Sequence, residues 1–105
     1  MTILEKQWKF VQMISLLIMY AYQKGYTMSF GDAFRYEDCP YGNPESLHKI
    51  RLAVDLNLFK DGVYLTSTED HLFLGEFWES LDPECAWGGR WGDGNHYSYK
   101  HEGKK

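Results

Sequence analysis

The sequence lacks a concentration of positive charge. Its 105 residues carry eleven Lys and Arg against fifteen Asp and Glu, which gives a formal net charge of -4 at pH 7. The basic residues are scattered, with residues 100–105 as the one mild exception. Nucleic-acid binding depends on clustered Lys and Arg that neutralise phosphates. The composition therefore argues against a nucleic-acid partner.

Long apolar runs are also missing. The longest, VQMISLLIMYAY at residues 11–22, is shorter than the roughly 20 residues that a membrane-spanning helix needs. No small-residue cleavage site clearly follows it, as one would after a signal peptide. We expect a buried helix here, no stable membrane insertion, and a product that stays in the cytoplasm unless another device releases it.

Cysteine is scarce, and the two thiols leave two interpretations open. Cys39 and Cys85 would pair in an oxidising compartment, but they are equally compatible with reduced, buried side chains. The length fits one domain over residues 1–105, with residues 100–105 as a flexible tail. We expect a monomer.

Apolar periodicity predicts a long N-terminal helix. Apolar residues recur at spacings of three and four, and Gly25 is placed to cap the helix; the set is Leu4, Trp8, Val11, Ile14, Leu17, Ile18, Ala21 and Tyr22. Residues 26–30 have strand composition, and residues 31–46 are rich in Gly, Pro, Asp and Asn, which is typical of a loop.

The second half of the chain predicts strands and one more helix. In residues 51–59 aliphatic residues at 52, 54, 56 and 58 alternate with a mostly polar set, and Asp61-Gly62 predicts a hairpin turn to residues 63–66. Ser67 and Thr68 begin a helix that Pro83 ends, with its apolar stripe at Leu74, Phe77, Trp78 and Leu81. A glycine-rich loop then leads to a strand from His96. The fold class is α+β, with two helices packed on a small, mostly antiparallel sheet.

Three residues on these strands suit a metal ion. A catalytic zinc usually takes three protein ligands and keeps one position open. His48 precedes the alternating strand, Asp55 lies on its polar face, and His96 begins the last strand, so antiparallel neighbours would bring them together. Asp93 lies on a turn close to His96. Each residue also has an ordinary interpretation, as a surface histidine or a turn aspartate.

Two segments resemble a known family. SLHKIRLAVDLNLF and WGGRWGDGNHYS are similar to the D-alanyl-D-alanine carboxypeptidase family of zinc peptidases, which includes VanY-type enzymes and bacteriophage endolysins that cut L-alanyl-D-glutamate bonds. Ser46, His48, Ala53 and Asp55 match the first half of the family pattern, and Asp93 and His96 match the second. The resemblance implies the hedgehog/D,D-peptidase-like form of the α+β fold.

The resemblance also implies roles for individual residues. Zn²⁺ would be held by His48, Asp55 and His96, with Asp93 as general base. Arg35, in FGDAFR, would clamp a substrate carboxylate or stabilise the oxyanion, although it is also compatible with a solvent-facing loop residue. Ser46 would bind substrate or simply cap the turn that carries His48.

Two positions depart from the family pattern. Arg51 stands where the family has Gly, which puts a close backbone approach at that point in doubt. Asp93 stands where the carboxypeptidase relatives tend to have Glu and the endolysin branch more often has Asp. A shorter acid needs a turn nearer to the metal, which Gly92 and Gly94 would permit. This favours the endolysin branch.

The remaining aromatic and histidine residues receive ordinary interpretations. We expect His71 in the first turn of the second helix, His101 in the tail, and Trp78 in the core. Trp87 and Trp91 would either line a wall for a sugar-peptide substrate or pack against the helices.

The resulting hypothesis is a peptidase acting on the peptidoglycan stem peptide, most specifically a phage endolysin that waits in the host cytoplasm until a pore releases it. A D-alanyl-D-alanine carboxypeptidase is the nearest alternative. A non-catalytic zinc-containing binding module, as in hedgehog domains, is disfavoured by Asp93, because a binding site needs no base. A metal nuclease is disfavoured by the acidic charge.

Overall fold

The computed structural model describes residues 1–42 and 45–105. Within these ranges it contains two α-helices and a five-stranded sheet. The helices are α1 (Ile3–Gln23) and α2 (Leu72–Leu81); the strands are β1 (Thr27–Phe30), β2 (Ala53–Lys60), β3 (Val63–Leu65), β4 (Cys85–Trp87) and β5 (His96–Tyr99). The α+β class predicted from the sequence is confirmed.

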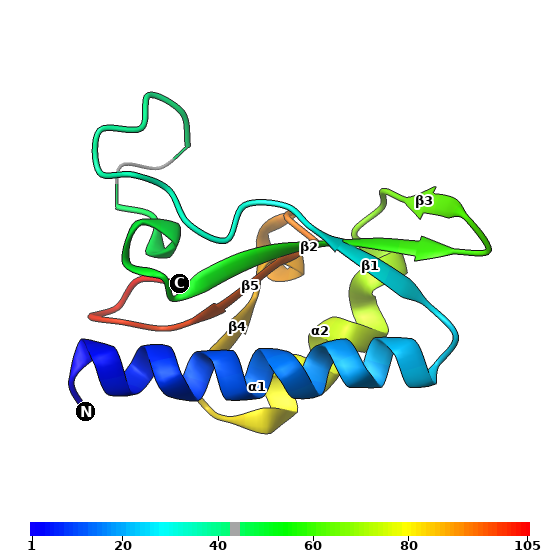
Figure 1. Cartoon of the computed structure of the whole chain (residues 1–105), viewed down its shortest axis with the longest axis horizontal. Coiled ribbons are helices and arrows are strands. Elements are labelled where there is room, and N and C mark those ends of the chain that lie inside the picture. The colour runs from blue at the N-terminus through cyan, green and yellow to red at the C-terminus, as the bar shows by residue number, and fades with distance from the viewer. Residues whose placement is uncertain (43–44) are drawn as a thin grey trace.

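Strand β2 is the centre of the sheet, and every pairing is antiparallel. The order is β1-β2-β5-β4, with β3 paired to the far end of β2 as a hairpin. Figure 1 shows α1 running along the length of the molecule, with α2 beside it. Both helices contribute to the same hydrophobic core as the strands. The other face of β2 and β5 is therefore free to carry polar groups.

Successive side chains of β2 alternate between the hydrophobic core and the opposite, polar face of the sheet. Leu52, Val54, Leu56 and Leu58 are all buried in the core, as their spacing predicts. Asp55 lies between them in sequence and points to the opposite face. The turn at Asp61 and Gly62 has two positive φ values, 51° and 78°, as expected for the tight hairpin that joins β2 to β3.

Both ends of α1 are capped by local contacts. Thr2 and Glu5 form a reciprocal capping box at the start. At the other end Gly25 has a φ of 89°, and the Tyr26 N–H donates to the Ala21 carbonyl at 3.1 Å, which closes a Schellman motif. The predicted cap at Gly25 is confirmed, whereas the capping box was not predicted.

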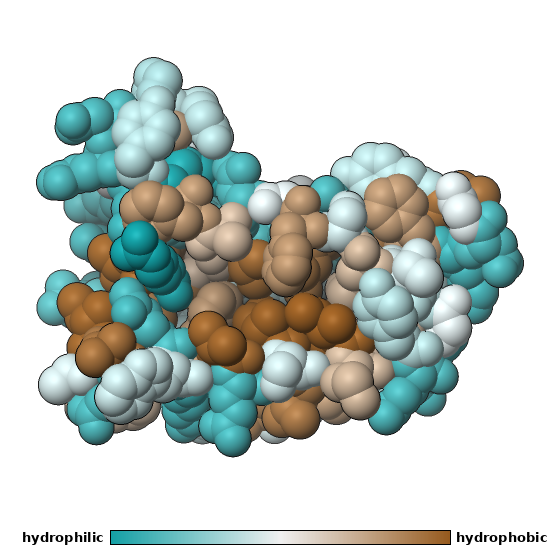
Figure 2. All heavy atoms as spheres, in the orientation of Figure 1, coloured by the Kyte–Doolittle hydropathy of each residue, from teal (hydrophilic) through white to brown (hydrophobic). Residues whose placement is uncertain are grey.

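The predicted apolar face of α1 is correct only in part: Ile14, Leu17 and Ala21 are buried in the core and Ile18 packs against it. The helix packs on the core through Phe10, Met13, Ile14, Leu17 and Ala21. Leu4, Trp8, Val11 and Tyr22 of the predicted set are exposed, and Figure 2 shows apolar atoms on the part of the surface along which α1 runs. This helix carries two overlapping apolar stripes, and periodicity cannot tell which of them meets the sheet.

The glycine-rich segment before the last strand also differs from the prediction, because residues 85–87 form strand β4. Its pairing with β5 is reinforced by the buried Trp78 indole, which donates to the carbonyls of Ala86 and Ser98 at 3.1 Å each. A three-residue strand is too short to show alternation. The predicted core position of Trp78 is confirmed.

Several smaller predictions are also resolved by the structure. Ser67 and Asp70 cap the second helical segment reciprocally, but a 3-10 turn (Glu69–His71) precedes α2, so His71 lies just before the helix. Cys39 and Cys85 are both free thiols. In the part of the chain that is described, no helix has the length and apolar character needed to span a bilayer.

Candidate functional site

Sheet register brings Asp55 and His96 together. Asp55 of β2 is directly opposite His96 of β5 in the antiparallel ladder, so the two side chains project from the same face as neighbours. Tyr97, the next residue of β5, points the other way and is fully buried against Trp78. The last strand thus gives one residue to the core and the preceding one to the site.

A short 3-10 helix, Leu47–Ile50, supplies His48. The Ser46 hydroxyl caps it by accepting a hydrogen bond from the His48 N–H at 3.2 Å. Arg51 ends it in the left-handed conformation, with a φ of 58°, and turns the chain into β2. Glycine is the residue favoured in this conformation, which explains why the family pattern that the sequence resembles has Gly at this position. The Arg51 side chain is exposed, with its guanidinium 4.1 Å from the Phe34 ring centre.

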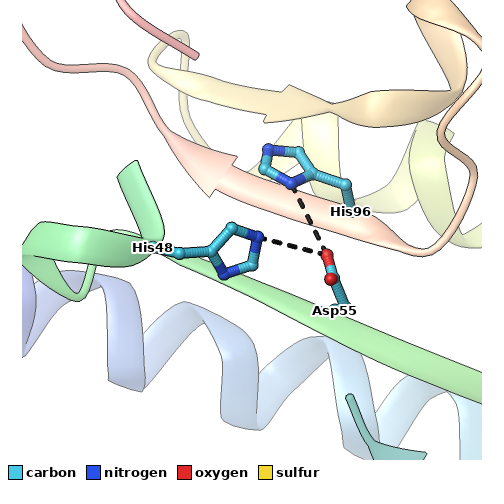
Figure 3. A group of neighbouring side chains, drawn as sticks. All are labelled: His48, Asp55 and His96. Carbon is cyan, nitrogen blue, oxygen red and sulfur yellow. Dashed lines mark ion pairs between the residues drawn. The ribbon is translucent and has the colours of Figure 1, made fainter. Parts of the chain in front are cut away.

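The three side chains converge on one point (Figure 3). His48 Nε2 lies 3.3 Å from Asp55 Oδ1, and His96 Nδ1 lies 3.6 Å from the same oxygen. Each residue offers a ligand atom within 4.8 Å of the others. Ligands about 2.0–2.2 Å from a tetrahedral zinc are separated by about 3.3–3.5 Å from one another. The distances from Asp55 Oδ1 to the two histidine nitrogens are therefore close to those of a zinc site.

The local electrostatics also fit a cation. The buried atoms His48 Nδ1, Asp55 Oδ1 and His96 Nε2 have no hydrogen-bond partner among the described residues. A buried polar atom without a partner is costly, and a cation between the three side chains would give Asp55 Oδ1 one. Burial by itself would raise the pKa of Asp55, but its interactions with His48 and His96 outweigh burial and lower the pKa to about 2.

This lowered pKa predicts an acid-sensitive metal-free protein. Because the folded-state pKa is below the ordinary 3.8, the ionised Asp55 stabilises the fold above pH 4 by about 2 kcal/mol. That contribution is lost as the pH falls from about 4 through 2. Urea unfolding of the metal-free chain at pH 5, 4, 3 and 2 measures it. Asp55→Asn should flatten this part of the profile, and an unchanged profile in that variant would contradict the assignment.

Asp93 lies beside the three-residue group. Its carboxylate is half exposed, and Oδ2 is 4.0 Å from His96 Nδ1. The backbone fixes the turn, because the Asp93 N–H donates to Gly88 O at 2.9 Å and the His96 N–H donates to Asp93 O at 3.1 Å. Gly92, with a φ of 84°, provides the turn that the sequence predicted. Asp93 is thus placed next to the group without belonging to it.

Gly88 lies directly against this turn, and the sequence analysis did not identify it as part of the site. A Cβ atom there would lie 2.2 Å from Asp93 O and 2.6 Å from His96 Cβ. We expect Gly88→Ala to displace both residues, to lower the free energy of unfolding by about 1–3 kcal/mol, and to weaken zinc binding. Denaturant unfolding and zinc titration measure these effects. Gly25→Ala is the control for destabilisation away from the site: its φ of 89° makes alanine strained there, but no atom lies within 4 Å of the added Cβ. Equal zinc affinity in both variants would contradict the role of Gly88.

Arg35 lies in the same region. Its side chain is 11% exposed, so it is not a solvent-facing loop residue. Its backbone N–H donates to His48 O at 3.1 Å, and its Nε donates to Asp32 Oδ2 at 3.2 Å. The guanidinium also lies 5.2 Å from the ring centre of Tyr41. The loop thus holds Arg35 beside the metal-binding group, while its role toward substrate stays a prediction.

A cleft of about 410 Å³ opens over the group. Its lining includes Arg35, Ser46, His48, Asp93 and His96, which the sequence singled out, Trp91, for which it left two roles open, and Gly42, Glu45, Lys104 and Lys105, which it did not assign to the site. The sequence analysis left open whether Trp87 and Trp91 line the substrate site or pack in the core. Trp87 is buried in the core, whereas Trp91 faces the cleft, with its ring centre 5.6 Å from that of His96. Ser46 both caps the turn and faces the cleft.

The comparison with protein families decides the class of protein. The family model of D-alanyl-D-alanine carboxypeptidase matches residues 41–99, more than half of the chain. The chain belongs to the D-alanyl-D-alanine carboxypeptidase family. No curated protein sequence matches it.

Members of this peptidase family are typically zinc-dependent, in agreement with the donor set in the structure. The matched range contains His48, Asp55, Asp93 and His96, whereas Arg35 lies before it and Lys104 after it. The family thus supports a peptidase with a metal centre at the junction of β2 and β5. Which bond it cuts is a separate question.

Proposed function

We propose that this chain is a zinc-dependent peptidase that hydrolyses a bond involving a D-amino acid in the peptidoglycan stem peptide. The observation that carries the proposal is the convergence of His48, Asp55 and His96 beside Asp93 in an open cleft. Family membership independently supports a peptidase. A site that only bound metal would not need a half-exposed carboxylate next to the ligands.

The donor set suits the chemistry. When bound by His48, Asp55 and His96, zinc supplies a Lewis acid that polarises a peptide carbonyl and lowers the pKa of water. Two neutral imidazoles and one carboxylate leave a net charge of plus one at the centre. Burial of the histidines excludes solvent from behind the group and so strengthens its electrostatic effect.

Asp93 and Arg35 would act on the substrate from the walls of the cleft. Asp93 accepts a proton from the attacking water and passes it to the departing amine nitrogen. Arg35 donates hydrogen bonds to a substrate carboxylate or to the carbonyl oxygen as negative charge develops there. Its contact with Asp32 and the Tyr41 ring restricts the guanidinium before substrate arrives.

The finer proposal is a phage endolysin that cuts the L-alanyl-D-glutamate bond. It is supported by the short acid at position 93 on a glycine-bounded turn, which the resemblance associates with the endolysin branch. We propose that such a protein remains in the host cytoplasm until a membrane pore releases it to the cell wall. A D-alanyl-D-alanine carboxypeptidase is the second candidate, favoured by the description of the matching family.

Digestion of purified muropeptides distinguishes these functions. Zinc-loaded protein, chelated protein and Asp93→Ala are incubated with muropeptides, and the products are identified by mass spectrometry. Release of the stem peptide at L-alanine supports the endolysin, and loss of one terminal D-alanine supports the carboxypeptidase. Products should be absent from the chelated sample and form at least about 100-fold more slowly in the Asp93→Ala sample. Intact muropeptides in all three samples would refute the enzyme and favour a binding module.

A further inference from the structure

The residues after β5 fold back toward the active-site cleft. His101 and Lys104 form a bridge in which the His101 N–H donates to Lys104 O at 3.0 Å and the Lys104 N–H donates to His101 O at 2.9 Å. Glu102 and Gly103 make the tight turn between them, with φ values of 49° and 77°. The flexibility predicted for this segment stays a prediction, but the turn defines where its last two residues lie.

Contacts on both sides hold this turn in place. The His101 ring, at Nδ1, lies 2.8 Å from the ammonium nitrogen of Lys6 on α1. On the cleft side the Lys105 ammonium lies 4.9 Å from the centre of the Trp91 ring. Trp91 in turn has an edge contact with His96. A chain of contacts therefore connects the basic segment to the metal-binding group.

Three basic side chains line the cleft, despite the net negative charge of the chain. Lys104 and Lys105 both line the cleft with Arg35. Among the described residues, neither lysine has a carboxylate within 4.0 Å, whereas Arg35 contacts Asp32. Acidic side chains in the lining are Glu45, which has other contacts, and Asp93. Two ammonium groups are thus available to an anionic ligand.

A second cleft next to Asp93 has a different chemistry. This cleft, of about 180 Å³, shares Asp93 with the first. Besides Asp93 and the buried His71, it is lined by neutral groups, including Asn57, Tyr64 and Asn95. The Asn57 side chain accepts hydrogen bonds from the Tyr64 hydroxyl and the Asn95 amide. The two clefts that meet at Asp93 therefore suit two different ends of one substrate.

We propose that Lys104 and Lys105, with Arg35, determine specificity by binding free carboxylates of the substrate peptide next to the scissile bond, while its neutral part occupies the cleft around Asn57. This inference rests on the proposed peptidase function and names its substrate class, an asymmetric peptide with an anionic segment. A peptide cut before D-glutamate has this form. Glutamate has two carboxyl groups, and because only one of them is joined to the next residue, the other remains a free carboxylate. Ammonium and guanidinium groups bind carboxylates by charge-assisted hydrogen bonds.

The test compares two peptides in two variants. One stem peptide carries free carboxylates after the scissile bond, and its partner carries carboxamides at the same positions. The wild type should prefer the carboxylate peptide in kcat/KM, and the preference should weaken as salt rises. In the double variant Lys104→Gln, Lys105→Gln the preference should fall about tenfold, mainly through KM. Lys104→Arg, Lys105→Arg should restore it.

The matched control is Lys24→Gln, Lys60→Gln, which removes two charges from lysines that lie over Tyr20 and Tyr26, away from the cleft. It should keep the wild-type preference. Cleavage of both peptides with no preference, or a preference that survives in the Lys104, Lys105 variant, would overturn this inference and leave the proposed function intact.

Peptide binding, measured by the fluorescence of Trp91, distinguishes a failure of this inference from a failure of the proposed peptidase function. The Lys105 ammonium contacts this indole, so a bound carboxylate should change its emission, and Trp91→Phe identifies the signal. If neither peptide is cleaved but the carboxylate peptide binds more tightly and depends on Lys104 and Lys105, the carboxylate site stands and the proposed reaction fails. Equal binding of the two peptides would overturn the site.

Discussion

Asp93→Asn lowers kcat by about 100- to 10,000-fold while the protein still binds zinc, because this is the range that a positioned general base contributes. The variant keeps the size of the side chain and the backbone hydrogen bonds of the turn. It removes the proton acceptor that lies 4.0 Å from His96 without removing a member of the three-residue group. Zinc stoichiometry and steady-state kinetics on a stem peptide measure the two effects separately.

The control for this variant is Asp38→Asn, which makes the same change on an exposed loop residue outside the cleft. It should keep wild-type kinetics. Asp93→Glu should keep more activity than Asp93→Asn, since it retains a carboxylate. Wild-type kcat in Asp93→Asn would show that Asp93 is not the base, and loss of zinc in that variant would show that it is a ligand.

Asp55→Asn should lower zinc affinity by more than about 100-fold, and with it the activity at micromolar zinc. Removing a partner that only orients a ligand typically costs 10- to 100-fold, and Asp55 contributes the negative charge at the point where both histidines meet. Its neutral amide oxygen would be a weaker ligand. Competition with a zinc-binding dye measures the affinity, and circular dichroism verifies the fold.

Asp61→Asn is a close control for this change. It lies just beyond the end of the same strand, in a turn with positive φ that Asn tolerates well. It should leave both zinc affinity and activity as in the wild type. If Asp55→Asn bound zinc as tightly as Asp61→Asn, the metal would have to bind elsewhere, and the account of the site would be wrong.

The candidate site was easier to predict from the sequence than the packing around it. Alternation in residues 52–58 determined which face of β2 is buried, and this placed Asp55 on the polar face. The expected pairing with the strand that begins at His96 then brought the two residues opposite each other. A period of two leaves only two choices of face, and one buried face excludes the wrong one.

Features that depend on long-range packing could not be predicted in this way. The buried stripe of α1 differs in part from the predicted one. Phe10 packs on Trp78 and Met13 on Cys85, whereas Trp8 and Val11 are also apolar and stay exposed. Only tertiary contacts make that choice. The same applies to β4, whose three residues are ordered by Trp78 and β5 and have no periodic pattern of their own.

Around the site, the features that could not be predicted from the sequence are contacts between distant parts of the chain. Gly88 is required because of its distance from the backbone of Asp93, and a sequence shows only that two glycines are adjacent there. The basic segment at residues 100–105 was visible as composition, but its return to Trp91 depends on the turn after His101. Arg51 is different, because its backbone conformation could have been predicted. The family pattern has Gly at this position, which suggests the positive φ that the structure shows.

The central claim is that one zinc ion is held by His48, Asp55 and His96. A crystal of the zinc-loaded protein, measured above and below the zinc absorption edge, tests it most directly. We predict one anomalous peak within about 2.0–2.2 Å of His48 Nε2, Asp55 Oδ1 and His96 Nδ1, with Asp93 close by but not bound. A peak on other residues, such as the thiol of Cys39, or no peak between these three side chains at full zinc occupancy, would contradict the account.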